Sequence, residues 1–241
     1  MSAKKNYPVY KLHAKGTIHP RSVEGNFRRF KTSVMILAYA TFFLLPWLRW
    51  QRPVGSQQAV HFDLVEKKFY LFDFVVHAQD IFWLAALLFF AAVFLFFMTA
   101  LLGRVFCGYF CFQTLWTDAF RFIEKKFQGD RVARIRLDKQ PWTREKLMKK
   151  GATHALWLLL AFWTGLTFVL YWADAPTVFV QFFSGNAHSA AYTTALILTI
   201  TTYLAAGWVK ENVCMHICPY ARFQSVMYDV DTMITAYDYQ R

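Results

Sequence analysis

The stretch "DIFWLAALLFFAAVFLFFMTALLG", residues 80–103, has no charged side chain between Asp80 and Arg104. A helix needs about 20 apolar residues to cross the hydrocarbon core of a bilayer, so this stretch predicts a transmembrane helix. Three further apolar stretches reach that length, near residues 32–50, 153–172 and 190–209. The sequence therefore predicts a four-span membrane domain over residues 32–209.

The composition agrees with a membrane protein. Hydrophobic residues make up 56% of the 241 residues and charged residues 17%, whereas an ordinary globular domain carries roughly 25% charged residues. A soluble protein would lack the polar sequence needed to cover four long buried helices, so a soluble fold is excluded. Aromatic residues gather at the ends of the spans, as interfacial anchors do: Trp47, Trp50, Trp157, Tyr171, Trp172 and Trp208.

The positive charges are sorted by topology. Residues 1–31, 104–152 and 210–241 carry 8, 12 and 3 Lys or Arg residues, whereas 49–79 carries 4 and 173–189 carries none. Four spans place the three basic segments on one side, which the positive-inside rule assigns to the cytoplasm. We therefore expect a basic cytoplasmic tail (1–31), a cytoplasmic loop (104–152) and a cytoplasmic C-terminal segment (210–241). The net charge of +12 then needs no nucleic-acid partner, and we expect no cleavable signal peptide before the first span.

The chain reads as two similar halves, each a pair of spans followed by Cys-x-x-x-Cys and an aromatic-rich segment that closes on Asp118 or Asp229. The predicted fold class is an all-α membrane protein with four transmembrane helices arranged as two similar helical hairpins, each followed by this motif on the cytoplasmic side. Polar and apolar residues alternate in the external segment 51–79, which predicts a short β-hairpin. Residues 119–152 predict a basic surface helix that is broken at Pro141.

The four cysteines stand in two stretches, "GRVFCGYFCFQTLW" (103–116) and "ENVCMHICPYARF" (211–223). Both stretches follow an inward-running span, so both pairs should reach the same depth, and residues at i and i+4 share a helical face. Two such pairs could form a pocket of four sulfurs. Cytoplasmic thiols stay reduced, and thiolates bind Cu(I), zinc or iron–sulfur clusters. The predicted metal ligands are Cys107, Cys111, Cys214 and Cys218.

Further side chains near the cysteines are candidate ligands. Pro219 predicts a helix start, which makes Cys218 the N-cap and favours its thiolate. Met215 and His216 add a thioether and an imidazole inside the second motif, although His216 faces away from the cysteines on a regular helix. His154 lies at the cytoplasmic end of the third span, at a similar depth. For both histidines an ordinary interfacial role is the alternative, and no catalytic residue is assigned.

Seven blocks of sequence resemble the CcoG/FixG/RdxA family of cytochrome c oxidase accessory proteins. They are "LPWLRW", "GRVFCGY", "QTLWTD", "GDRVARIRLDKQPW", "DAPT", "TTYLAAG" and "CPYARFQSVMYD", and the resemblance runs from about Tyr7 to Arg241. It implies a protein of the bacterial cytoplasmic membrane that takes part in the assembly of cbb-type haem–copper oxidases, reducing Cu(II) to Cu(I) with its paired cysteines.

The chain departs from the family pattern in two ways. Family members carry proline after both cysteine pairs, whereas Phe112 follows the first pair here. The family also continues into a ferredoxin domain and a β-rich domain, which this sequence lacks. The resemblance therefore implies a separate electron donor.

The resulting prediction is a thiolate metal or redox protein that handles or reduces copper during oxidase assembly. Its expected partners are the lipid bilayer, a copper ion and the oxidase assembly factors or a respiratory complex. One alternative is an electron-transfer subunit whose four cysteines hold a 4Fe-4S cluster. Another is a non-catalytic scaffold subunit of a respiratory membrane complex.

Overall fold

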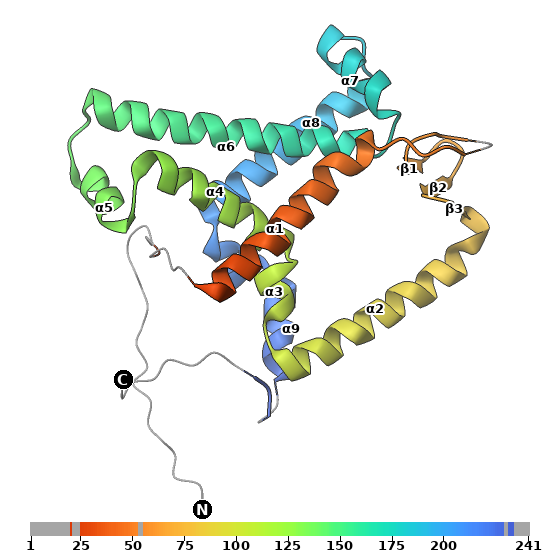
Figure 1. The fold of residues 1–241 in the computed structure, drawn as a ribbon, viewed down its shortest axis with the longest axis horizontal. Coiled ribbons are helices and arrows are strands. Elements are labelled where there is room, and N and C mark those ends of the chain that lie inside the picture. Colours follow the sequence, from red (N-terminus) through yellow and green to blue (C-terminus); the bar gives the residue numbers. More distant parts are fainter. Residues whose placement is uncertain (1–19, 21–24, 53–54, 229–230, 234–241) are drawn as a thin grey trace, which may run out of the picture.

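A computed structural model describes residues 20, 25–52, 55–228 and 231–233 as a largely helical chain (Figure 1). Most of the expected tail 1–31, part of the C-terminal segment and Asp229 lie outside the described residues. The elements are α1 (Asn26–Leu44), η1 (Leu45–Trp47), β1 (Val60–Asp63), β2 (Lys68–Leu71), β3 (Phe74–His77), η2 (Ala78–Asp80), α2 (Ile81–Leu102), α3 (Val105–Tyr109), α4 (Phe112–Gln128), α5 (Arg131–Lys139), α6 (Arg144–Leu170), α7 (Ala175–Ser184), α8 (Ser189–Thr202), η3 (Tyr203–Val209), η4 (Val213–Ile217) and α9 (Pro219–Met227).

Four helical segments are long and apolar enough to cross a membrane, which confirms the number of spans. They are Asn26–Trp47, Ile81–Leu102, Arg144–Leu170 and Ser189–Val209. The first ends in a short 3-10 turn at Pro46, since proline interrupts the α-helical hydrogen bonds. The third begins nine residues before the expected 153, because the polar sequence "REKLMKKGA" continues the helix beyond its apolar part.

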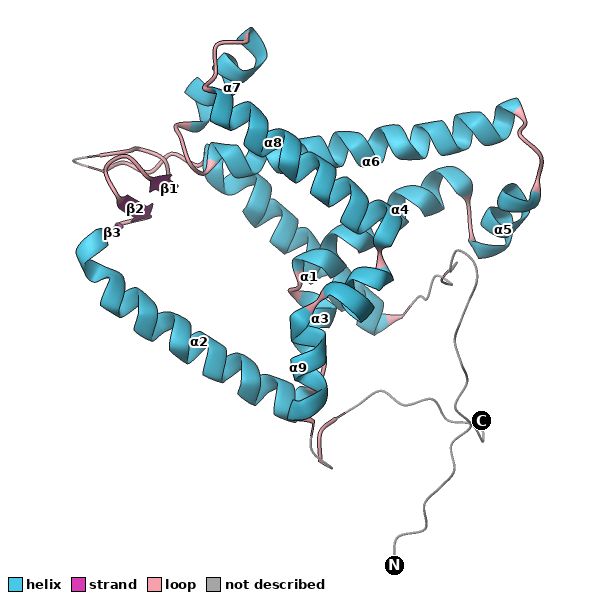
Figure 2. Cartoon of the chain, turned by 180° about the vertical axis from the view of Figure 1, so that it is seen from behind, coloured by secondary structure: helices cyan, strands magenta, loops and turns pink. Residues whose placement is uncertain are grey.

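Helices α6 and α8 pack closely along their length (Figures 1 and 2). Gly165 allows the contact, since a Cβ atom there would stand 2.6 Å from the carbonyl oxygen of Ala195 and 3.0 Å from the hydroxyl oxygen of Thr199. Small residues at helix interfaces let membrane helices approach closely. The close contact at Gly165 therefore joins the third and fourth spans.

Helix α2 stands apart from the other spans, and none of its most apolar window is buried (Figure 1). At one end it joins a three-stranded antiparallel sheet with the order β1-β2-β3. The alternation in 51–79 thus predicted the antiparallel pairing but not the third strand, and the fold is all-α apart from this sheet. The backbone N–H of Phe62 donates to the carbonyl of Tyr171 at 2.9 Å, which ties the sheet to the end of α6.

Helix α4 forms part of the core, contrary to the expectation of a surface helix from residue 119 onward. Trp116 and Phe120 are 3% and 0% exposed, and the Phe120 ring stacks on Trp157 of α6 with centroids 5.3 Å apart. The indole of Trp116 donates to the hydroxyl of Thr164 at 2.8 Å. This helix has one apolar face, made by Leu115, Trp116 and Phe120. Its charged residues had indicated a helix exposed to solvent.

A single methyl group at Gly165 tests the α6–α8 contact. Gly165→Ala should lower the free energy of unfolding by roughly 1–3 kcal/mol, because the added Cβ meets the backbone of α8. Gly151→Ala on the same helix is the matched control, since no atom lies within 4 Å of its added Cβ. That change should be neutral or stabilising by up to about 1 kcal/mol. Unfolding of both variants in detergent micelles measures the difference, and equal effects would contradict the packing.

Candidate functional site

The second cysteine of each pair begins a helix. Cys111 is the N-cap of α4 and Cys218 is the N-cap of α9, with φ and ψ of −66° and 126° in the first and −70° and 113° in the second. Helix α9 begins at Pro219, as the sequence predicted, whereas Phe112 occupies the equivalent position after Cys111. The helix start after the first pair therefore forms without proline.

Both pairs are wrapped in the same wide backbone turn. The N–H of Cys111 donates to the carbonyl of Phe106 at 3.0 Å, and the N–H of Cys218 donates to the carbonyl of Val213 at 2.8 Å. Each hydrogen bond spans five residues and reaches the residue just before the first cysteine of the pair. The two motifs are thus locally alike in hydrogen bonding as well as in spacing.

The segment that carries the first pair lies against the helix that follows the second. The Cys107 sulfur is 4.0 Å from the side-chain oxygen of Gln224 on α9, and the Gln224 amide donates to the carbonyl of Gly103 at 3.4 Å. The hydroxyl groups of Thr99 on α2 and Tyr220 on α9 are 2.7 Å apart. Residues more than a hundred positions apart in sequence therefore meet at the ends of α2 and α9.

The cysteines influence one another electrostatically. Burial raises the pKa of the Cys107 thiol to about 11, and the charges of Cys111, Cys218 and Cys214 raise it further, against Arg104. Burial, followed by Cys111 and Cys218, likewise raises the pKa of Cys214, and Arg104 again opposes the shift. All four thiols are free. We call these four residues the four-thiol site: Cys107, Cys111, Cys214 and Cys218.

The donor set suits a soft cationic group. Mutual repulsion of the thiolates would be relieved by a bound cation, and the N-termini of α4 and α9 favour negative charge beside them. Within the described ranges, no three His, Cys, Asp or Glu side chains are already arranged as ligands of one ion. The four cysteines therefore stay predicted ligands of a common group.

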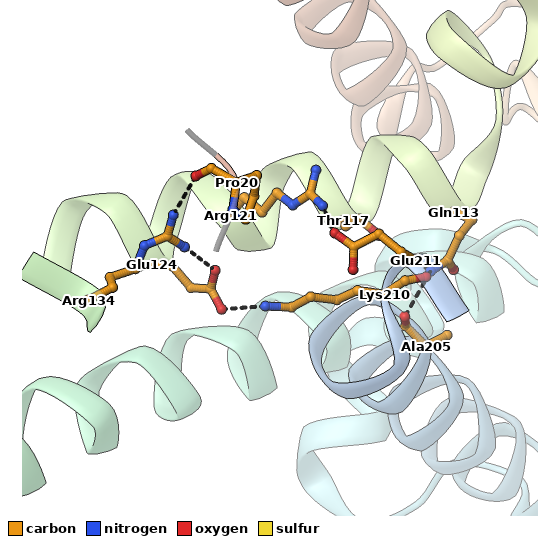
Figure 3. Close-up of polar contacts among 9 residues, drawn as sticks. All are labelled: Pro20, Gln113, Thr117, Arg121, Glu124, Arg134, Ala205, Lys210 and Glu211. Carbon is orange, nitrogen blue, oxygen red and sulfur yellow. Dashed lines mark hydrogen bonds and ion pairs between the residues drawn. The ribbon is translucent and has the colours of Figure 1, made fainter. Parts of the chain in front are cut away.

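A turn between the fourth span and the second pair rests on α4 (Figure 3). Lys210 has a φ of 39°, an uncommon value for a residue other than glycine. We call Lys210 and Glu211 the Lys210 turn. The side-chain amide of Gln113, two residues after Cys111, donates to the carbonyl of Ala205 at 2.8 Å and to that of Lys210 at 3.2 Å.

Ion pairs hold the same turn (Figure 3). The Lys210 ammonium binds the Glu124 carboxylate, which also pairs with Arg134 of α5 at 2.9 Å. The side chains of Lys210, Glu124 and Arg134 are only 15%, 10% and 9% exposed. One turn further back on α4, Arg121 pairs with Glu211. The helix that begins at the first cysteine pair thus fixes the approach to the second.

The three additional candidate ligands lie in different surroundings. Met215 and His216 belong to η4 and are exposed, Met215 by 56%. His154 lies on α6, where its Nδ1 is 3.0 Å from the hydroxyl of Tyr203 and its ring meets Trp157 edge-on. Their roles as ligands remain predictions. The sequence did not identify Gln113, Glu124 and Lys210 as residues that hold this turn. Only Lys210 carried a recognisable signal, as the first charged residue after the fourth span.

Comparisons with known proteins identify the chemistry of both halves. A 4Fe-4S binding domain matches residues 82–129, and a 4Fe-4S dicluster domain matches residues 209–241. Nitrogen fixation protein FixG of Rhizobium meliloti is 40% identical over 96% of this chain and 44% of its own length. Protein RdxB and Protein RdxA of Cereibacter sphaeroides are 41% and 39% identical over 91% of this chain, covering 46% and 47% of their lengths. The chain spans less than half the length of these relatives, and no solved structure matches it.

The expected copper cofactor, and with it the copper ion as a partner, is wrong. Both matching domains are 4Fe-4S domains, and each includes one of the two cysteine pairs. The alternative prediction, an iron–sulfur electron-transfer protein, is the one that these matches support. Thiolates bind Cu(I) and iron–sulfur clusters alike, so the ligand type alone had not separated the two.

Removing the carboxylate beneath the Lys210 turn tests its role. Glu124→Gln leaves the buried Lys210 and Arg134 without a counter-charge, so we expect a loss of roughly 3 kcal/mol in the free energy of unfolding. Glu145→Gln is the matched control, because it breaks the exposed Glu145–Lys149 pair of α6 and should cost under about 0.5 kcal/mol. Denaturant unfolding in micelles measures both values. A Glu124→Gln variant as stable as the control would contradict a stabilising role of the buried Lys210–Glu124–Arg134 ion pairs.

Proposed function

The chain belongs to the CcoG/FixG/RdxA family, and from that premise we propose that it transfers electrons through one 4Fe-4S cluster held by the four-thiol site. A cluster of this kind takes four cysteine thiolates. The chain has four cysteines in total, and the charges of three of them act on Cys107. The observation that carries the proposal is the contact between the two halves at this point, where the Cys107 sulfur lies 4.0 Å from the side-chain oxygen of Gln224 on α9.

The surroundings of the thiols favour the net negative charge that four thiolates and a bound cluster would carry together. When bound, the cluster supplies one-electron chemistry. Cys111 and Cys218 hold their sulfurs at the N-termini of α4 and α9, where the helix dipoles are positive. Arg104 acts on both Cys107 and Cys214, so its positive charge favours the added electron. Cys214 is exposed, which leaves a side open for a donor or an acceptor.

The topology we propose follows the distribution of positive charge. The four spans cross the bacterial cytoplasmic membrane as two hairpins, and both termini, the loop 104–152 and the segment 210–241 lie in the cytoplasm. The four-thiol site then faces the cytoplasm at the membrane surface. The sheet and α7 lie on the opposite side.

The partners we propose are a separate electron donor and a respiratory complex or the factors that assemble a haem–copper oxidase. The family supports the oxidase connection. The donor would deliver its electron at the exposed side of the four-thiol site. The same arrangement accounts for an exposed Cys214.

Iron and acid-labile sulfide analysis of the purified protein tests the proposal. Protein reconstituted without oxygen should hold about four iron and four sulfide per chain. Single changes of Cys107, Cys111, Cys214 or Cys218 to Ser should each remove most of this iron and the visible absorption of the cluster. Met215→Leu and His216→Gln are the matched controls inside the second motif and should retain both.

Two results would overturn the assignment. Iron and sulfide at wild-type content in Cys107→Ser and in Cys214→Ser would show that the two pairs do not share one cluster. Stoichiometric copper in place of iron would refute the iron–sulfur chemistry.

A further inference from the structure

A large open groove is lined by residues of α1, α4 and α5, together with Leu160 of α6. Its volume is about 970 Å³, which is at the upper end of the range for small-molecule sites. Helix α1 lies beside α4, and α5 follows α4 at one side of the molecule (Figure 1). The groove is separate from the four-thiol site, since none of the four cysteines lines it.

The walls of the groove are of two kinds. Met35 and Ile36 of α1, with Leu160 of α6, form an apolar wall inside two of the membrane spans. Phe122 of α4 adds an exposed aromatic side chain to the lining of the groove. An amphipathic molecule could therefore lie with its apolar part along the spans and its polar part at the level of α4 and α5.

The polar mouth carries an excess of positive charge. It is lined by six cations and only two carboxylates, Asp118 and Asp130. The cations are Arg28, Arg121, Lys125, Lys126, Arg131 and Arg134. Lys126 and Arg131 are exposed, and neither forms an ion pair with another residue in the part of the chain that the structure describes.

Two buried donors in the mouth have hydrogen-bonding capacity left. The Nε atoms of Arg121 and Arg134 are buried and have no partner within the described residues. Arg134 is 7% exposed, and its other nitrogens are held by Glu124 at 2.9 Å and by the Pro20 carbonyl at 3.0 Å. Burial also lowers the pKa of Arg121, which already pairs with Glu211, and a second anion at its Nε would stabilise its charge further. Phosphate oxygens are suitable acceptors for such guanidinium groups.

We propose that this groove binds an anionic phospholipid, with the headgroup phosphate at Arg121, Lys126 and Arg131 and one acyl chain along Met35, Ile36 and Leu160. A free phosphate would leave the apolar wall without a ligand. An uncharged quinone would suit that wall but leave the cations without a counter-charge. Basic pockets between transmembrane helices are known to take anionic lipid headgroups.

Lipid binding to the full chain in detergent micelles tests the proposal by native mass spectrometry. The probes are phosphatidylglycerol, phosphatidylcholine with the same acyl chains, and inorganic phosphate. Phosphatidylglycerol should stay bound, and phosphatidylcholine should bind at least about tenfold more weakly. Lys126→Gln combined with Arg131→Gln should weaken phosphatidylglycerol binding by about tenfold or more, because each basic residue near an anionic lipid contributes to affinity.

A control with the same loss of charge separates a site from general attraction. Lys139→Gln combined with Arg144→Gln removes two exposed cations of the same loop that do not line the groove, and phosphatidylglycerol binding should change less than about twofold. Equal losses in the two double variants would overturn the proposal. Displacement of the lipid by inorganic phosphate at equal concentration, or by an uncharged quinone, would also overturn the proposal. Retention of phosphatidylcholine equal to that of phosphatidylglycerol would do the same.

Discussion

Lys210 leaves the fourth span with a positive φ, and α4, the helix that begins at the first cysteine pair, binds the turn that leads to the second pair. Gln113 donates to the carbonyls of Ala205 and Lys210 at the end of the span, and Glu124 neutralises the Lys210 side chain. A membrane helix that ends without such partners would expose its last carbonyls. The same helix begins at Cys111, so one element fixes both pairs.

This arrangement links stability to the position of the sulfurs. The Lys210–Glu124–Arg134 group is nearly buried, so breaking one pair leaves charges without compensation. On the other side, Tyr220 and Gln224 attach α9 to the ends of α2 and α3. Two sets of contacts therefore join the segments that carry the two cysteine pairs.

The sequence predicted the parts of the fold that depend on local pattern. Length and hydropathy located the four spans, and Pro219 predicted that Cys218 begins a helix. The start of α6 at Arg144 was not predicted, because its first residues are polar and give no hydropathy signal. The burial of α4 depends on contacts of Trp116 and Phe120 with distant helices. The wide turns around the cysteine pairs replace the regular helix that was expected there.

The site could be predicted by residue type but not by metal. Paired cysteines at one depth identified the ligands to propose, whereas thiolate softness fits copper and iron–sulfur clusters equally. The two 4Fe-4S domain matches separated them. The contacts that hold the Lys210 turn could not be predicted, because isolated charged and amide side chains form no recognisable sequence motif.

Cross-linking across the two pairs tests the central claim most directly. A variant that keeps only Cys107 and Cys214, with Ser at positions 111 and 218, is treated with a short bifunctional maleimide in cluster-free form. Mass spectrometry of the tryptic peptides should find the two cysteines joined within one chain, and Gln113→Ala in this background should reduce the yield. If each cysteine instead carries its own maleimide and no cross-link joins the two peptides, the pairs lie apart. That result would contradict a shared site.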